Sequence, residues 1–240
     1  MFDTLWPGGP RFLKSEDGFK LSTDSVLLAH FAAPLRAGAI MDLGCGSGVL
    51  TVLLQLSHPS ARVEGVELQP EASALCRRNM AENGLPDDGI LTGDLRAYRT
   101  LWKAGAYDLV VSNPPYFTSG SGYASPDPAR AAARAERTCT LDELCAAAAW
   151  LCRWGGAFAL VHRPERLAEI FCAMRAYALE PKRLRLVQHR FDRPPNLALI
   201  EARRGGNPGL TVCAPLVLCD PDGGDSDEIR EIYHIRENGA

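Results

Sequence analysis

Short apolar runs and longer helical patterns alternate along most of this chain. The runs predict strands at residues 39–43, 62–67, 90–92, 107–113 and 157–162. Apolar positions spaced three and four apart predict helices between them, at about residues 49–57, 70–83 and 141–152. Strands that alternate with helices form a mostly parallel sheet covered on both faces, so we expect an α/β fold.

The two ends of the chain break this rhythm. Residues 1–20 hold aromatic side chains among proline and glycine, which predicts a short arm or hairpin, and a helix is expected over residues 23–31. After Pro164 the pattern predicts one more helix, to about Leu179, and then two adjacent strands at residues 183–191 and 196–202. Because no helix separates these two strands, we expect an antiparallel hairpin at the end of the sheet.

These patterns divide the chain into three parts. We expect an N-terminal arm and helix over residues 1–35, a central domain over residues 36–204 and a C-terminal extension over residues 205–240, since the regular pattern ends at the glycines of residues 205–209. Residues 119–137 contain few bulky apolar side chains and predict a long loop or a lid over a site.

The composition of the 240 residues is typical of a globular protein, with 46% hydrophobic and 23% charged residues. No stretch is apolar enough to span a membrane and the N-terminus does not resemble a secretory signal, which leads us to expect a cytoplasmic protein. The eight cysteines never occur as Cys-x-x-Cys. Their spacing favours buried free thiols over a zinc site or disulfides, so we expect no metal.

The net charge of −3 does not by itself indicate a nucleic-acid partner, but the charges are unevenly placed. Residues 175–204 carry eight basic and three acidic side chains, whereas residues 220–240 carry seven acidic and two basic ones. The basic stretch either meets a polyanion or forms a solvated surface, and the sequence leaves both interpretations open.

The first strand of the alternating region ends in the glycine-rich sequence DLGCGSG, residues 42–48. Glycines at the carboxyl end of a strand let a ligand approach the backbone closely. The third glycine comes one residue too early for the G-x-G-x-x-G fingerprint. A nicotinamide dinucleotide is therefore disfavoured.

Two acids follow the neighbouring strands. Glu67 ends one strand, where its carboxylate can accept hydrogen bonds from both hydroxyls of a ribose, and Asp94 follows the next, where it can accept one from an adenine amino group. Taken singly, the glycines indicate only a tight turn and the acids only charges at helix N-termini. Together, in this order, they predict a site for a nucleoside without phosphates.

The strand over residues 107–113 runs into the sequence SNPPYF, residues 112–117. Two consecutive prolines fix the backbone, so the amide oxygen of Asn113 and the carbonyl of Pro114 can point together into a cleft. Such a pair of acceptors matches the two protons of a planar NH2 group, and both bonds would direct the nitrogen lone pair at a methyl donor. Tyr116 offers a face on which a base can stack. The alternative is a rigid turn that carries a core aromatic residue.

DLGCGSG, the two acids at strand ends and NPPY together resemble the class I methyltransferases that use S-adenosylmethionine and modify amino nitrogens. GFKLSTDSVLLA (residues 18–29), NPPYF followed by RAE (134–136), and VHRPERL (161–167) narrow the resemblance to the bacterial enzymes that methylate N6 of adenine 37 in valine tRNA. The resemblance implies a Rossmann-like sheet of seven strands with an antiparallel last strand. It also implies that residues 36–204 form the methyltransferase domain.

Roles for individual residues follow from the resemblance. It implies that S-adenosylmethionine is converted to S-adenosylhomocysteine without a metal, at cofactor-binding residues Asp24, Asp42, Gly44, Gly46, Gly48, Glu67, Asp94 and Asn113. It implies a catalytic loop made of Asn113, Pro114, Pro115 and Tyr116. The expected partner is tRNA, with no membrane and no obligate protein partner.

Other interpretations stay open. The methylated amino group can belong to a protein glutamine or to a base of ribosomal RNA, and a non-catalytic module that binds the cofactor or RNA is a further alternative. Four arginines either contact phosphates or are simple surface charges: Arg134, Arg137, Arg163 and Arg166.

Overall fold

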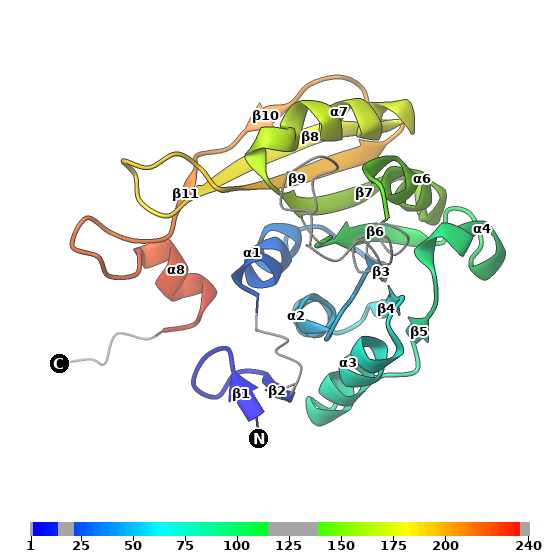
Figure 1. The fold of residues 1–240 in the computed structure, drawn as a ribbon, viewed down its shortest axis with the longest axis horizontal. Coiled ribbons are helices and arrows are strands. Elements are labelled where there is room, and N and C mark those ends of the chain that lie inside the picture. The colour runs from blue at the N-terminus through cyan, green and yellow to red at the C-terminus, as the bar shows by residue number, and fades with distance from the viewer. Residues whose placement is uncertain (1, 14–21, 115–138, 236–240) are drawn as a thin grey trace, which may run out of the picture.

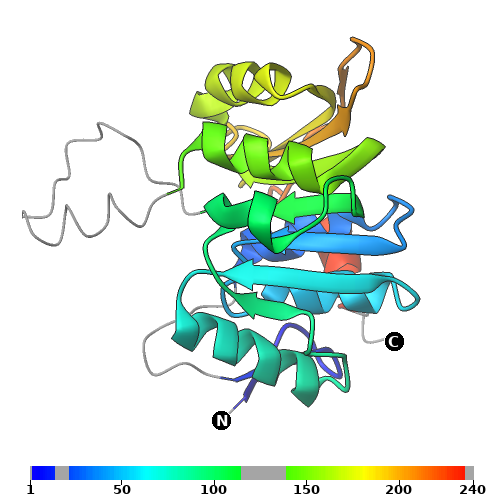
Figure 2. The same cartoon turned by 90° about the vertical axis from the view of Figure 1, so that its right-hand side faces the viewer.

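A computed structural model describes residues 2–13, 22–114 and 139–235. Its centre is a sheet with the strand order β10-β8-β9-β7-β6-β3-β4-β5, and β11 pairs with β8 outside this order. The strands are β3 (Ala39–Leu43), β4 (Arg62–Glu67), β5 (Ile90–Thr92), β6 (Tyr107–Ser112), β7 (Cys152–His162), β8 (Leu179–Gln188), β9 (Leu197–Arg204), β10 (Thr211–Val212) and β11 (Leu216–Val217). Helices cover both faces of the sheet (Figure 1, Figure 2).

The direction of strand pairing confirms the predicted topology. The strands from β3 to β7 pair in parallel, whereas β9 lies between β7 and β8 and is antiparallel to both. The strands from β3 to β9 therefore form the expected seven-stranded sheet with an antiparallel last strand. The short strands β10 and β11 extend this sheet by parallel pairing with β8.

The helices form two layers. One face is covered by α1 (Thr23–Ala32), α2 (Val49–Ser57), α3 (Pro70–Glu82) and α8 (Asp227–Ile232), and the other by α4 (Tyr98–Leu101), α6 (Leu141–Leu151) and α7 (Leu167–Ala176). The short helices η1 (Leu95–Ala97) and η2 (Pro164–Arg166) precede α4 and α7. Successive strand residues point to opposite faces, so Ile40 joins one core and Met41 the other. None of the helices described here has the length and hydropathy needed to cross a membrane.

Element boundaries agree with the sequence pattern most closely in the first half of the sheet. β3, β4, β5 and α2 begin and end at the expected residues. β7 begins at Cys152 rather than residue 157 because its first residues include Gly155 and Gly156, which interrupt the apolar run. A Cβ at Gly156 would lie 2.6 Å from the Cys152 sulfur and 2.9 Å from the carbonyl oxygens of Arg153 and Asp108, so glycine is required at this position of the strand.

The N-terminal arm is a hairpin, as predicted. β1 (Phe2–Thr4) pairs with β2 (Arg11–Leu13) in antiparallel register, and Phe12 is buried in the core. The Leu13 amide donates to Asn79 Oδ1 at 2.9 Å, and Asn79 Nδ2 donates to the carbonyl of Ser47 at 2.8 Å. One side chain of α3 thus connects the arm to the glycine-rich loop.

The C-terminal extension has structure that the sequence pattern did not predict. β10 and β11 are two residues long, too short to show a period, and they form because β8 offers an open edge. The acidic helix α8 is joined to the basic strand β8 by Arg185, whose two terminal nitrogens bond the two Glu228 oxygens at 2.5 and 2.6 Å. The basic strand and the acidic helix are thus linked by a partly exposed ion pair.

Glu228→Gln should lower the stability of the protein by about 1 kcal/mol, which corresponds to a fall in melting temperature of roughly 2–4 °C. The substitution keeps the volume of the side chain but removes one member of a bidentate, partly exposed ion pair. Thermal unfolding followed by circular dichroism measures the effect. Glu231→Gln, on the exposed side of the same helix, is the control and should leave the melting temperature unchanged. Equal melting temperatures for Glu228→Gln and the original protein would contradict this account.

Candidate active site

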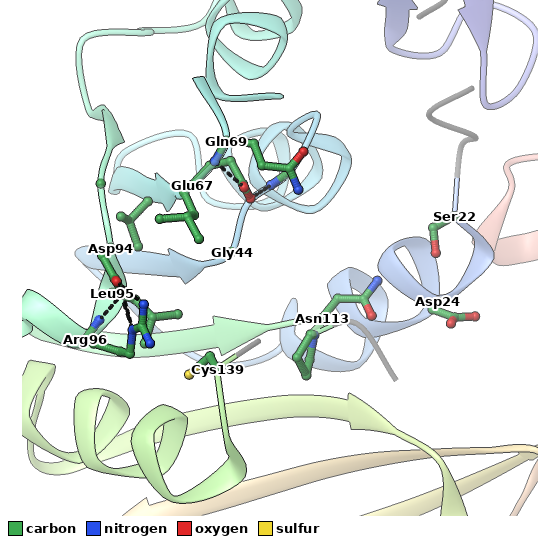
Figure 3. Close-up of a pocket in the computed structure, with 15 residues that line it drawn as sticks. Ser22, Asp24, Gly44, Glu67, Gln69, Asp94, Leu95, Arg96, Asn113 and Cys139 are labelled. Carbon is green, nitrogen blue, oxygen red and sulfur yellow. Dashed lines mark hydrogen bonds and ion pairs between the residues drawn. The ribbon is translucent and has the colours of Figure 1, made fainter. Parts of the chain in front are cut away.

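A pocket of about 410 Å³ opens at the carboxyl ends of β3, β4, β5 and β6, next to the start of α1 (Figure 3). Seven of the residues predicted from the sequence line it: Asp24, Gly44, Gly46, Glu67, Asp94, Asn113 and Pro114. Asp42 lines a smaller adjoining hollow of about 180 Å³ together with Asn113. Pro115 and Tyr116 lie outside the described residues.

The glycine-rich loop leaves open space on the pocket side. Gly44 and Gly46 have φ angles of 77° and 54°, and a Cβ added at either would meet no atom of the described residues within 4 Å. Gly48 faces the other way, because a Cβ there would lie 2.6 Å from the sulfur of Cys76 on α3. The first two glycines thus create a cradle for a ligand, and the third lets the loop pack against a helix.

Glu67 holds the glycine-rich loop against the end of β4. One carboxylate oxygen accepts the Gly46 amide at 3.0 Å, and the other accepts the Gln69 amide at 2.9 Å. The amides of Gly44 and Cys45 donate to the carbonyl of Val66 at 2.9 and 3.0 Å, which fixes the same loop from its first residue. Each carboxylate oxygen has capacity for a second hydrogen bond, so Glu67 can support the loop and accept from a ligand at once.

Asp42 is buried beneath the loop. Thr51 donates to its Oδ2 at 2.7 Å, while Oδ1 is buried and has no hydrogen-bond partner among the described residues. Burial raises the pKa of Asp42 to about 7, the Thr51 bond lowers it, and the charge of Glu67 raises it further. A buried acceptor without a donor is the kind of atom that a bound ligand satisfies.

Asp42→Asn should stabilise the ligand-free protein by at least about 1 kcal/mol at pH 8. The folded pKa lies above the unfolded one, so the wild-type carboxylate destabilises the fold increasingly as pH rises from about 4 to 7. The advantage of asparagine should grow over the same range, as measured by urea unfolding at several pH values. Asp108→Asn is the control. Because Arg153 lowers the pKa of Asp108, this variant should become less stable relative to the original protein as the pH rises, the opposite pH dependence. A pH-independent difference for Asp42→Asn would contradict this prediction.

The position of Asp94 is compatible with both of the roles that the sequence left open. It lines the pocket, and it also caps η1 by accepting the Arg96 amide at 2.9 Å. The Arg96 guanidinium bonds both carboxylate oxygens at 2.6 to 3.0 Å, and this pairing lowers the pKa of Asp94. Arg96, which also lines the pocket, was not foreseen and shares the carboxylate with any ligand that reaches it.

Asn113 is oriented by a residue that the sequence analysis did not select. Its Nδ2 donates to Ser25 Oγ on α1 at 2.9 Å, and Ser25 is buried. The preceding Ser112 donates to the carbonyl of Leu43 at 2.7 Å and ties the end of β6 to the end of β3. Because the amide nitrogen donates to α1, Oδ1 is the atom of this side chain that can receive an incoming amino group.

Cys139 completes the wall of the pocket on the side of α6 (Figure 3). Burial raises the pKa of its thiol to about 12. A thiol that stays protonated is a poor nucleophile, so a covalent intermediate on Cys139 is disfavoured.

The sequence model of a protein family described as the methyltransferase small domain matches residues 15–170, more than half of the chain. The chain belongs to this family. Its central sheet has the Rossmann-like arrangement of class I methyltransferases. The matched span includes α1, the helix that supplies Ser25 and Asp24 to the site.

Among proteins similar to this methyltransferase are two named tRNA1(Val) (adenine(37)-N6)-methyltransferase. The one from Porphyromonas gingivalis W83 is 33% identical over 191 residues, which cover 77% of this chain and 74% of the relative. The one from Aeromonas hydrophila is 34% identical over 211 residues, which cover 87% of this chain and 86% of the relative. A solved structure of a predicted O-methyltransferase from Agrobacterium tumefaciens has a TM-score of 0.71 at 22% identity, covering 88% of this chain and 96% of that one, and shows the fold.

The basic residues of this methyltransferase are largely paired within the molecule. In the stretch 175–204, five of the eight form ion pairs with described residues: Arg175, Arg183, Arg185, Arg190 and Arg203. Arg166 pairs with Glu169, and Arg163 donates to the carbonyl of Asn196. Arg134 and Arg137 lie outside the described residues. Most of the basic stretch is therefore engaged in ion pairs with neighbouring carboxylates, several of them at the surface.

Proposed function

We propose that this protein transfers a methyl group from S-adenosylmethionine to the exocyclic N6 nitrogen of an adenine in tRNA, in the cytoplasm. By the names of its relatives, the nucleotide is adenine 37 of valine tRNA. The observation that carries the proposal is the Asn113 side chain, held by Ser25 beside an open glycine cradle. The proposed step includes neither a metal ion nor a protein partner, and the methyltransferase domain of the proposal is residues 36–204 with α1 attached to it.

The residues of the pocket fit S-adenosylmethionine. Gly44 and Gly46 leave space for it, and the unsatisfied Oδ1 of Asp42 beneath them is suited to accept a hydrogen bond from the α-ammonium group of its methionine moiety. Glu67 and Asp94 would accept from the ribose hydroxyls and the adenine amino group, with Asp24 at the pocket edge. When bound, this cofactor supplies a methyl group on a positively charged sulfur.

Asn113 and Pro114 act on the nucleophile. The amide oxygen of Asn113 and the carbonyl of Pro114 accept the two protons of the adenine amino group, which removes its lone pair from conjugation with the ring. The nitrogen would then take the methyl group as the bond between that carbon and the cofactor sulfur breaks, and it would release one proton to solvent, so no strong base is required before transfer. Ser25 keeps Asn113 Oδ1 in place as the acceptor.

An adenine in an anticodon loop is already partly unstacked, which lowers the free energy needed to place it in the pocket. A transcript of valine tRNA and the same transcript with guanine at position 37 test the proposal together. The first should yield N6-methyladenosine and the second should yield none. Equal methylation of both transcripts would contradict the position, and methylation of neither would contradict the substrate.

A further inference from the structure

The loop between β8 and β9, residues 189–196, exposes a large apolar side chain. Phe191 is 64% exposed, and Arg190 and Arg193 flank it in the sequence. Exposed aromatic rings next to arginine are characteristic of surfaces that hold single-stranded nucleic acid, because bases stack on the ring and phosphates pair with the guanidinium. Phe191 has no role in the pocket already described.

The topology places this loop at the same end of the strands as Asn113. β7 runs parallel to β6, and β9 runs antiparallel to β7, so β9 begins where β6 and β7 end. β8 is antiparallel to β9 and therefore ends on this side of the sheet too, where β6 and β7 end. The glycine-rich loop lies on the other side of β6, after β3. The β8–β9 loop and the proposed cofactor residues thus lie on opposite sides of Asn113, at the same end of the strands.

The loop is fixed at both ends. Arg163 Nη1 donates to the carbonyl of Asn196 at 3.1 Å, and Arg190 Nη2 donates to the carbonyl of Pro221 at 3.1 Å. The Arg193 amide closes a turn on the carbonyl of Arg190 at 3.0 Å, and two prolines follow at positions 194 and 195. Because the backbone is already ordered, little conformational entropy is lost when a ligand stacks on Phe191.

The charges of this loop differ from those of β8 beneath it. The β8 arginines Arg183 and Arg185 are paired with buried or helical carboxylates, so they are not available to a polyanion. Arg190 is also paired, since its Nε lies 3.5 Å from Asp192 Oδ1. Arg193 is exposed and forms no ion pair with a described residue. A phosphate is therefore best placed beside Arg193, next to the exposed ring.

We propose that Phe191 stacks on an unpaired base of the RNA substrate and that Arg193 contacts a neighbouring phosphate. This surface rests on the proposed function, because its ligand is the RNA that presents the target adenine. It would hold a single-stranded nucleotide outside the pocket, and a duplex offers no free base face for such stacking. The two residues act in binding rather than in methyl transfer.

Phe191→Ala should weaken binding of unmodified tRNA roughly tenfold, whereas Phe191→Trp, which keeps an aromatic ring, should bind tRNA as tightly as the original protein. Fluorescence anisotropy with labelled tRNA and no cofactor measures binding apart from catalysis. Trp154→Ala is the matched control. Trp154 is 69% exposed but lies near the start of β7, at the opposite end of the strands from Phe191. It should bind tRNA like the original protein. The turnover number of Phe191→Ala at saturating tRNA should be unchanged.

Arg193→Ala should reduce the slope of log affinity against log salt concentration by about one. Original affinity in Phe191→Ala, or an equal loss in Trp154→Ala, would overturn the proposed surface while leaving the proposed reaction intact. If the original protein methylates a peptide and neither binds nor methylates tRNA, the proposed function fails, and this inference fails with it.

Discussion

Replacing Asn113 by alanine is expected to lower the turnover number for methyl transfer by roughly 10²–10³-fold. The substitution removes the amide oxygen that we propose accepts an amino proton of the substrate, an interaction that strengthens as the nitrogen becomes the nucleophile. Cofactor affinity should change less than about threefold, because the glycine cradle, Glu67 and Asp42 are untouched. Single-turnover kinetics and calorimetric titration of S-adenosylmethionine separate the two effects.

Ser25→Ala is the companion variant. Ser25 is a positioning residue, since it contacts Asn113 through its hydroxyl. Its loss should lower the turnover number by about tenfold and leave the Michaelis constant for the cofactor unchanged. Full activity of Asn113→Ala would contradict the proposed mechanism, and so would a loss that is matched by an equal loss of cofactor affinity.

Glu67→Ala should weaken S-adenosylmethionine binding by roughly 100-fold or more. Two effects combine, because the variant loses the acceptors proposed for the ribose hydroxyls and the bond that holds the Gly46 amide. Hydrogen bonds to a charged group contribute about 1.5–3 kcal/mol each. The dissociation constant from calorimetric titration is the quantity to measure.

Glu71→Gln is the matched control for Glu67→Ala. Glu71 is exposed in the first turn of α3 and does not line the pocket, so its variant removes a nearby carboxylate charge without touching the site. Cofactor affinity should be that of the original protein. An equal loss in both variants would show that general electrostatics, rather than contact with Glu67, determines the affinity.

The bounds of β3, β4 and β5 could be predicted to the residue because their signals are local. β3 and β5 are short apolar runs, β4 carries two valines among polar residues and a glycine, and each strand ends at or beside a candidate ligand-binding residue. The C-terminal strands were missed because β10 and β11 have no pattern of their own and depend on the open edge of β8.

The site could be predicted where one segment contains the signal. The glycine-rich loop, Glu67 and Asn113 each follow a strand, so the topology brings them together. Ser25 was missed because its role depends on a tertiary contact, the bond that Asn113 donates to α1. Arg96 was missed although its partner Asp94 is only two residues away, because the sequence analysis considered Asp94 without its neighbours. The spacing of residues along the chain contains no information about the contact between Ser25 and Asn113.

The most direct test of the central claim is to incubate the protein with methyl-labelled S-adenosylmethionine and total unmodified tRNA, digest the tRNA to nucleosides and identify the labelled product by mass. The account predicts labelled N6-methyladenosine and no other labelled nucleoside. Binding of the cofactor without any labelled nucleoside, together with labelled glutamine in a protein substrate or labelled guanosine in ribosomal RNA, would contradict it.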